Sequence, residues 1–173
     1  MKKNYLFLFL IIFLSGCSSA SLQEAIEKSG GYSKVQILFE EVNDQVVIFH
    51  GEDRNAKQII GLNVYSTGIG NRYEPGTGEH SQPVDIYSDF DTINISRIDH
   101  DSKTILWGWL YNYPSAKEFN YTIIGNNGNV IYESTIEVKE NGIIYEKLPI
   151  DIGEVLRYHF KIYDDEGNII SEK

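Results

Sequence analysis

Cysteine and positive charge are both scarce in this chain. Cys17 is the only cysteine among 173 residues, which excludes disulfides, thiolate metal clusters and cysteine nucleophiles elsewhere in the fold. Lys and Arg together number 15 against 25 Asp and Glu, a formal net charge of −10. Phosphate backbones repel a body of this charge, so a nucleic-acid partner is excluded. A domain without disulfides must be stabilised by its own core.

The chain also lacks a hydrophobic run long enough to cross a membrane. Ten largely apolar residues, Tyr5 to Leu14, follow Lys2-Lys3, whereas a spanning helix needs about 20. A basic start, a short apolar run and small residues before a cleavage point are typical of a secretory signal. Residues 1–16 are therefore predicted to be a signal peptide that is removed on export.

Leu14-Ser15-Gly16-Cys17 closes this leader and resembles the lipobox of bacterial lipoproteins. The resemblance implies a diacylglycerol on the sulfur of Cys17, cleavage before Cys17, and acylation of the new amino group. Two or more acyl chains hold a protein firmly at a membrane, whereas a single chain binds reversibly. The implied location is extracytoplasmic, anchored by lipid to the bacterial cell membrane. The alternative is an ordinary signal peptide with a cysteine near its end.

The mature chain is more acidic than the precursor. Removing Lys2 and Lys3 leaves 15 − 2 = 13 Lys and Arg against 25 acids, a formal charge of −12. The lipid, rather than a basic patch, must then hold this body at an anionic bilayer. Residues 17–21 are expected to be the acylated cysteine and a tether. Because Ser18 to Ala20 spans about 10 Å when extended, the folded part is expected to begin close to the membrane.

Recognisable catalytic motifs are missing. The four histidines are scattered without metal-ligand spacing: His50, His80, His100 and His159. There is no His-Glu-x-x-His motif, no Gly-x-Ser-x-Gly elbow and no Ser-x-x-Lys pair, so neither a zinc hydrolase nor a serine nucleophile has local support. We therefore predict a protein that is not an enzyme and that has no metal and no cofactor other than the lipid.

One acidic cluster offers a calcium candidate. Five aspartates crowd one stretch of the chain: Asp85, Asp89, Asp91, Asp99 and Asp101. Carboxylates on adjacent loops suit calcium, which takes six to eight oxygens, but the spacing matches no calcium-binding loop. The favoured interpretation is a solvated, charge-rich edge.

The pattern of the mature chain predicts a mainly β protein with one short helix. Ser21-Leu22-Gln23-Glu24 has the spacing of a capping box, an apolar stripe follows at helical spacing, and Gly30-Gly31 ends the segment. We expect this helix to cover a sheet. Runs rich in β-branched and aromatic residues then predict an antiparallel meander of strands at Val35 to Val42, Val46 to His50 and Gln58 to Ser66.

The second half predicts an antiparallel sandwich of about seven strands. Apolar and polar residues alternate from Val130 to Val138 and from Leu156 to Ile162, as in strands with one solvated side. Tight hairpins are predicted at three turns: Asn126-Asn127-Gly128, Glu140-Asn141-Gly142 and Asp165-Glu166-Gly167-Asn168. The predicted organisation is a helix-and-sheet module over 22–88 and a sandwich over 89–173.

The last hairpin carries a resemblance of its own. An aromatic strand, Tyr158 to Tyr163, runs into Asp164-Asp165-Glu166-Gly167-Asn168, and this ending looks like that of bacterial immunoglobulin-like modules. The resemblance implies an immunoglobulin-like β-sandwich for the second half. Such modules serve as spacers, adhesion elements and binding platforms, and the fold alone does not choose among these.

Thr67 to Pro83 is the longest stretch without a clear pattern. Its four glycines and two prolines predict a loop without regular structure, either functional or disordered. Gly68-Ile69-Gly70 opens it, but neither a Gly-Lys-Ser/Thr sequence nor a helical pattern follows, so nucleotide binding is not expected.

Aromatic residues concentrate in one strand-like run. Alternation places five side chains on one face: Ile105, Trp107, Trp109, Tyr111 and Tyr113. Leu106, Gly108 and Leu110 line the other face. With both faces apolar, we expect burial on both sides. The alternative is an exposed aromatic ligand face made by Trp107, Trp109, Tyr111 and Tyr113, because large exposed apolar patches mark binding sites.

Two functions remain open at this stage. The first, which we favour, is a lipoprotein whose β body binds an envelope protein or a cell-wall ligand at the outer face of the membrane. The second is an envelope hydrolase or transferase with a site at the Thr67–Pro83 loop and the aspartate cluster. A closed cleft holding a histidine or carboxylate against that loop would favour the second.

Overall fold

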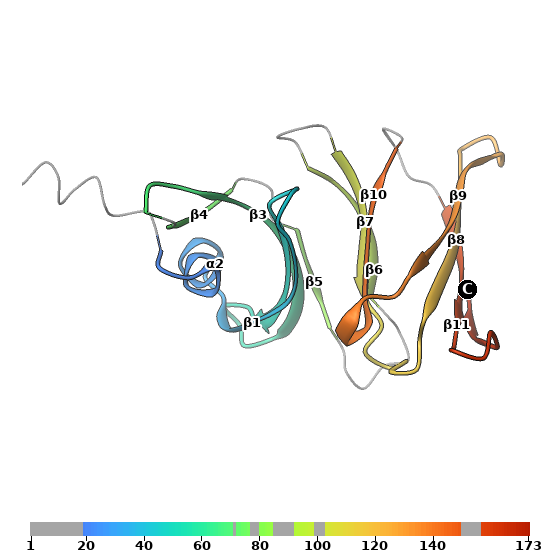
Figure 1. Ribbon diagram of the computed structural model, residues 1–173, viewed down its shortest axis with the longest axis horizontal. Helices are drawn as coiled ribbons and strands as arrows, with labels where there is room; N and C mark the ends of the chain where they lie inside the picture. The colour runs from blue at the N-terminus through green and yellow to red at the C-terminus, as the bar shows by residue number, and fades with distance from the viewer. Residues whose placement is uncertain (1–18, 71, 77–79, 85–91, 99–102, 150–156) are drawn as a thin grey trace, which may run out of the picture.

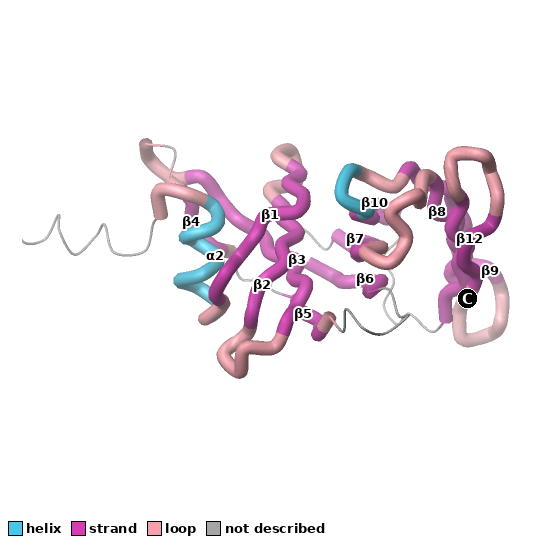
Figure 2. Tube along the Cα trace, turned by 90° about the horizontal axis from the view of Figure 1, so that it is seen from below, coloured by secondary structure: helices cyan, strands magenta, loops and turns pink. Residues whose placement is uncertain are grey.

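The computed structural model describes residues 19–70, 72–76, 80–84, 92–98, 103–149 and 157–173. The predicted leader and Cys17 lie outside these residues. The described chain is mainly β, with antiparallel sheets and one short α-helix. Its layers follow one another along the long axis: the helix, a first sheet, a central sheet and an outer sheet (Figures 1 and 2). The predicted fold class, a helix on an antiparallel meander followed by a β-sandwich, is confirmed.

Helix α2 (Leu22–Gly30) begins and ends where its caps predict. The Ser21 hydroxyl accepts a hydrogen bond from the Glu24 amide at 3.1 Å. The carboxylate of Glu24 accepts from the amide of Ala20 rather than of Ser21, at 3.0 Å, so the capping box is displaced by one residue. Gly31 ends the helix in the left-handed region with φ 69°, which glycine adopts at no steric cost.

The first sheet is built around a long central strand. Its strands are β1 (Ser33–Glu41), β2 (Val46–Glu52), β3 (Gln58–Thr67), β4 (Tyr73–Pro75) and β5 (His80–Pro83). The order is β1-β2-β3-β4, and β5 also pairs with β3. The meander predicted for the first three strands is therefore present, with strand ends that differ by one or two residues from the prediction.

The prediction of an irregular Thr67–Pro83 loop is wrong. Strand β4 pairs with Tyr65–Thr67 and β5 pairs with Ile59–Leu62, so two short strands share one side of the longer β3. Each ends at a proline, a position where the missing amide donor costs no hydrogen bond within the sheet. Gly68 lies in the turn between β3 and β4, where its amide donates to the carbonyl of Arg72 at 2.7 Å.

Seven further strands form the sandwich. They are β6 (Thr92–Ile98), β7 (Lys103–Trp109), β8 (Glu118–Ile124), β9 (Val130–Glu137), β10 (Ile143–Leu148), β11 (Arg157–Tyr163) and β12 (Ile169–Glu172). The central sheet has the order β10-β7-β6 and the outer sheet the order β12-β11-β8-β9. Hairpins join β8 to β9 and β11 to β12, with Gly128 at φ 78° and Gly167 at φ 80°.

The tight turn predicted at Glu140-Asn141-Gly142 is present, with an antiparallel bridge between Lys139 and Ile143, but the two strands that it joins belong to different sheets. Both central residues have positive φ, Asn141 at 60° and Gly142 at 75°, as a tight turn requires. The segment is, however, a 3-10 turn, η1 (Glu140–Gly142), that carries the chain from β9 in the outer sheet to β10 in the central sheet. Local turn chemistry cannot tell a hairpin from a crossing between two layers.

Three apolar clusters hold the layers together. The helix core joins α2 to the first sheet through Leu22, Ile26, Val35, Val47, Phe49, Ile59 and Tyr65. The junction core joins the first and central sheets through Val46, Ile48, Ile60, Leu62, Val84, Ile98, Ile105, Trp107 and Ile143. The sandwich core fills the space between the central and outer sheets, with Leu106, Phe119, Tyr121, Ile144 and Ile162 among its members. The apolar stripe of α2 thus covers a sheet, as predicted, and the central sheet is covered on both faces.

A polar contact reinforces the junction core at its edge. The hydroxyl of Tyr145 donates to Asp44 at 3.1 Å, and the ammonium of Lys147 lies 3.3 Å from the same carboxylate. Asp44 belongs to the turn between β1 and β2, whereas the other two residues belong to β10. Burial, followed by the charge of Asp44, raises the pKa of Tyr145, so this phenol remains a hydrogen-bond donor.

The one α-helix of the described residues, α2, has nine residues. Within that part of the chain, no helix has the length and apolar character needed to span a membrane.

Candidate functional site

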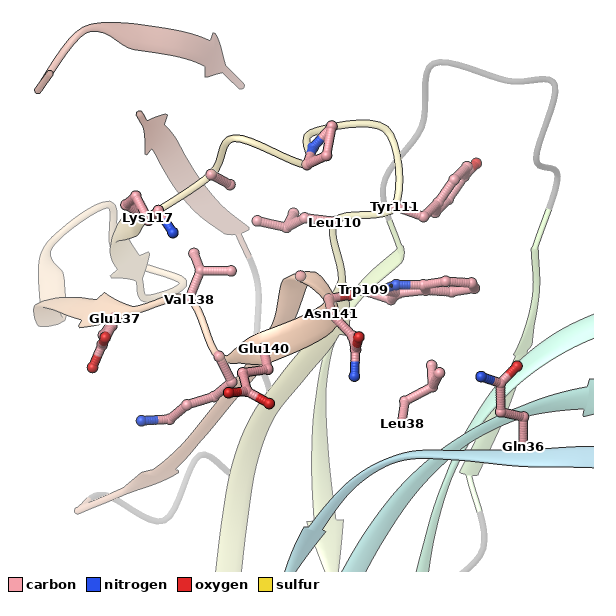
Figure 3. A pocket seen from close by; sticks show the side chains of 14 residues that line it. Gln36, Leu38, Trp109, Leu110, Tyr111, Lys117, Glu137, Val138, Glu140 and Asn141 are labelled. Atoms are coloured by element: carbon pink, nitrogen blue, oxygen red, sulfur yellow. Dashed lines mark hydrogen bonds between the residues drawn. The ribbon is translucent and has the colours of Figure 1, made fainter. Parts of the chain in front are cut away.

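A half-open groove of about 620 Å³ lies where β1 of the first sheet meets one end of the sandwich. Figure 3 shows the groove between strand β1 and the turns that follow β7 and β9. Its walls come from three segments far apart in the sequence: Gln36 and Leu38; Trp109, Leu110, Tyr111, Pro114, Ala116 and Lys117; and Glu137, Val138, Lys139, Glu140, Asn141 and Gly142. Because the first sheet and the sandwich both contribute, the groove exists only when the two are packed together.

Trp109 forms the aromatic wall and is held by the backbone of η1. Its indole N–H donates to the carbonyl of Asn141 at 2.9 Å, and the amide of Leu110 donates to the carbonyl of Gly142 at 2.8 Å. The turn can approach this closely because Gly142 has no side chain: a Cβ there would lie 3.0 Å from the carbonyl of Leu110. The indole donor is therefore already used, and the ring offers a ligand only apolar contact.

Two further aromatic rings flank Trp109. The ring centroids of Tyr111 and His50 each lie 5.3 Å from that of the indole, a distance typical of tilted aromatic pairs. Trp109 and Tyr111 are both partly buried. The aromatic wall is thus a supported surface rather than a pair of loose side chains.

His50 lies behind this wall and is electrically neutral there. Its Nε2 is buried and has no hydrogen-bond partner. Burial lowers the pKa of His50 below 6.5, and hydrogen bonding to Gln58 and the charge of Glu52 oppose that effect. A protonated imidazole would place an unsatisfied donor in the junction, so the neutral form fits the packing.

A β-bulge supplies the opposite wall. The pairing of β1 with β2 shifts register between Ile37 and Phe39, so Leu38 is an extra residue in β1. Both Leu38 and Phe39 then pack against the junction core, although neighbouring residues in a regular strand point to opposite faces. Bulges of this kind redirect a side chain at a sheet edge, and here Leu38 lies across the groove from Trp109 (Figure 3).

The other end of the groove is charged. Lys117, Glu137, Lys139 and Glu140 are all exposed, and none of the ion pairs found within the described residues involves them. Leu110 and Val138 lie between this end and the aromatic wall (Figure 3). A ligand that fills the groove must therefore place an apolar group against Trp109 and polar or charged groups about Lys117 and Lys139.

The groove presents aromatic, apolar and charged side chains to a ligand. Its lining residues include no serine, threonine, cysteine or histidine, and the two glutamates are exposed to water.

The structure separates the aromatic residues that the sequence grouped together. Strand β7 ends at Trp109, so alternation no longer governs the residues beyond it. Trp107 is fully buried in the junction core, Tyr111 packs beside the same core, and Tyr113 packs against the sandwich core on the other side. The chain turns there because the amide of Tyr113 donates to the carbonyl of Leu110, at 3.1 Å. An exposed ligand face can therefore include Trp109 and Tyr111 but not Trp107.

Other candidates from the sequence do not meet in this site. All five aspartates of the calcium candidate, Asp85, Asp89, Asp91, Asp99 and Asp101, lie outside the described residues, as does His100. His159 is exposed on the outer sheet, and the Nε2 of His80 lies 3.3 Å from the carbonyl of Arg97. Within the described ranges, no three His, Cys, Asp or Glu side chains form a group that could hold a metal ion.

Sequence reasoning missed most of the groove. Leu38 was assigned to a strand, but nothing local predicted the bulge that turns it toward Trp109. Lys117 and Lys139 are ordinary charged residues next to strands, and only the packing of the two sheets brings them together. Only the turn at Asn141-Gly142 could be predicted from the sequence. Its residue types indicate positive φ but not the hydrogen bond that the indole of Trp109 donates to its backbone.

The fold and the groove together define a class: a mainly β protein with an aromatic groove between a helix-covered sheet and a seven-stranded sandwich. Comparison with known proteins finds no matching family model, no similar curated protein and no similar solved structure.

Proposed function

We propose that this chain is an exported bacterial lipoprotein without enzymatic activity, whose body binds an envelope protein or a cell-wall ligand in the groove beside Trp109. The observation that carries the proposal is the supported aromatic wall. Trp109 and Tyr111 are partly buried, braced by His50, and open on one side to a groove of about 620 Å³. Aromatic anchors in concave, mainly apolar surroundings are typical of binding sites.

The anchor is supported by the leader and by the backbone hydrogen bonds that join Ser19 to Tyr73. Lys2-Lys3, the short apolar run and Leu14-Ser15-Gly16-Cys17 have the pattern of an exported lipoprotein. The described fold begins two residues after Cys17, at Ser19. Acyl chains on Cys17 would therefore hold the body at the outer surface of the membrane, and the lipid is the only group that the proposal adds to the chain.

The sandwich is proposed to be an immunoglobulin-like module. Its first, second and fifth strands make one sheet and the remaining four make the other, an arrangement that supports the resemblance in the last hairpin. Modules of this architecture often act as binding platforms, and the groove gives that general role a location.

Lipid attachment is tested by metabolic labelling. The full chain expressed in a bacterium with radiolabelled palmitate should incorporate label, and Cys17→Ala should abolish both the label and membrane retention. Cys17→Ser is the matched control, because it retains a small polar side chain and lacks the thiol that forms the thioether. An unlabelled wild-type chain with an unmodified Cys17 by mass spectrometry would remove the anchor from the proposal.

Ligand binding is tested by site-specific photo-crosslinking in whole cells. A benzophenone amino acid at Tyr111 should give a discrete crosslinked product, whereas the same amino acid at His159, exposed on the outer sheet, should not. Trp109→Ala combined with the probe at Tyr111 should abolish the product, while Trp109→Phe should retain part of it. Equal crosslinking at both positions, or a product that survives Trp109→Ala, would contradict binding in the groove.

A further inference from the structure

The turn between β3 and β4 presents an isoleucine to solvent. Ile69 is 99% exposed, the most exposed of the large apolar side chains in the described residues. Glycines flank it on both sides, and Gly70 has φ 76° with open space where a Cβ would be. The turn is closed by the hydrogen bond from the amide of Gly68 to the carbonyl of Arg72 at 2.7 Å. The isoleucine therefore has nothing in the described fold to cover it.

The start of the folded chain is bonded directly to this hairpin. The amide of Ser19 donates to the carbonyl of Tyr73 at 2.9 Å, and the amide of Tyr73 donates back to Ser19 at 3.0 Å. Ser19 is buried, and the next residues are fixed by the cap of α2, through Ala20 and Ser21. The stretch expected to be a flexible tether is thus part of the fold from Ser19 onward.

This attachment places Ile69 at the end of the molecule where the lipid would be. Ser19 is two positions after Cys17, a reach of about 7 Å when extended. The β3–β4 turn and Ser19 lie together at one end of the long axis, and the sandwich lies at the opposite end (Figures 1 and 2). If Cys17 is acylated, the bilayer surface is held close to this turn.

We infer that the β3–β4 turn is a membrane contact and that Ile69 enters the interfacial layer of the bilayer that holds the acylated Cys17. This inference rests on the proposed lipoprotein function. Burying an exposed isoleucine removes apolar area from water. Because the anchor already holds the protein at the bilayer, this contact does not have to bring the protein there from solution. With a formal charge of −12 on the mature chain, charge does not draw the body to an anionic surface, so the contact is apolar.

The contact gives the molecule an orientation. Acyl chains at one point leave a protein free to tilt, whereas a second contact beside the anchor restricts the tilt. With the β3–β4 turn on the membrane, the sandwich projects away from it. The groove beside Trp109, between the first sheet and the sandwich, is then held off the bilayer surface where a ligand can reach it.

The test uses the acylated full-length protein in vesicles of phosphatidylethanolamine and phosphatidylglycerol. Ile69→Cys carries an environment-sensitive fluorophore, and Val42→Cys is the matched control. Val42 is also an exposed apolar residue, 68% exposed, but lies beside Asp44, which bonds to β10. Because lipid occupies the sulfur of Cys17, each variant has one free thiol. Both substitutions are at exposed positions, so folding is not at risk.

At position 69 the fluorophore should shift to the blue and be quenched several-fold more by nitroxide-labelled lipids than at position 42. Iodide in the aqueous phase should show the reverse order. Vesicle-bound protein whose position-69 fluorophore is as accessible to iodide as the control would overturn the inference, as would a blue shift without quenching by the labelled lipid. Flotation and the mass of the Cys17 peptide are measured on the same samples. A chain that is neither acylated nor vesicle-bound would instead refute the proposed anchor.

Discussion

The two tryptophans of β7 lie on the same face of one strand, two residues apart, and have different environments. Trp107 is fully buried at the centre of the junction core, and its indole N–H donates to the side chain of Ser96 at 2.9 Å. Trp109 is partly buried at the edge of that core, and its indole N–H donates to a backbone carbonyl of η1. The apolar face of a strand can thus change from core to the wall of a groove within two residues.

The comparison predicts a large difference in stability. Trp107→Ala should lower the free energy of unfolding by about 3–5 kcal/mol, because it leaves a cavity between two sheets. Trp109→Ala should cost about 1 kcal/mol, the centre of the range for single substitutions, because solvent can enter the space it leaves. Urea denaturation of both variants, followed by far-ultraviolet circular dichroism, measures the two values.

Crosslinking should rank the two positions in the opposite order. Under conditions where both are folded, Trp107→Phe should retain the crosslink from position 111 and Trp109→Ala should lose it. Equal losses of stability for Trp107→Ala and Trp109→Ala would mean that Trp109 is a core residue, and the distinction between core and groove would fail.

A smaller effect should come from the hydrogen bond that fixes Trp107. Ser96→Ala leaves the buried indole N–H without an acceptor, which should cost about 1–3 kcal/mol. In the Trp107→Phe background the same substitution should cost much less, because the donor is gone. Denaturation of the four proteins in this double-mutant cycle gives the coupling directly. A coupling free energy near zero would show that water accepts the hydrogen bond of the indole N–H when the Ser96 hydroxyl is removed. Water would then reach the centre of the junction core.

The strand that carries both tryptophans, the helix and two hairpins show which parts of the fold the sequence could predict. The apolar residues on both faces of the run from Ile105 to Tyr113 predicted burial on both sides, which holds for the part that forms β7, and the capping signals predicted α2. Positive-φ turns at Gly128 and Gly167 located two hairpins. Each of these signals is local, since it depends on residues within a turn or two of one another.

The failures share a different cause. Strands β4 and β5 exist because β3 is long enough to pair with both, and no pattern inside Thr67–Pro83 records the length of β3. The crossing at Asn141 and the bulge at Leu38 depend on how separate sheets are packed. The groove is built from these long-range features, and for that reason the sequence located its aromatic residues but not its shape.

The smallest expected effect concerns pH and the residue behind Trp109. Burial lowers the pKa of His50 below its ordinary value of 6.5, so the unfolded chain binds a proton at a higher pH than the folded chain does. The free energy of unfolding then increases with pH across the interval between the lowered pKa and 6.5. Stability from this group is complete above pH 6.5 and is lost as the pH falls below it.

Substituting His50 isolates this contribution. In His50→Gln the fall in stability between pH 7.5 and pH 5 should be smaller than in the wild-type chain, whereas His159→Gln, at an exposed position, should leave the wild-type profile unchanged. Glu52 and Asp53 also have lowered pKa values, but the ordinary values for these groups are 4.5 and 3.8. Their effect on stability therefore falls at lower pH than that of His50. Denaturation at several pH values gives the slopes. If the profile of His50→Gln matched the wild type, the imidazole would have to reach water or an acceptor on protonation, and Trp109 would be braced by a mobile ring rather than a fixed one.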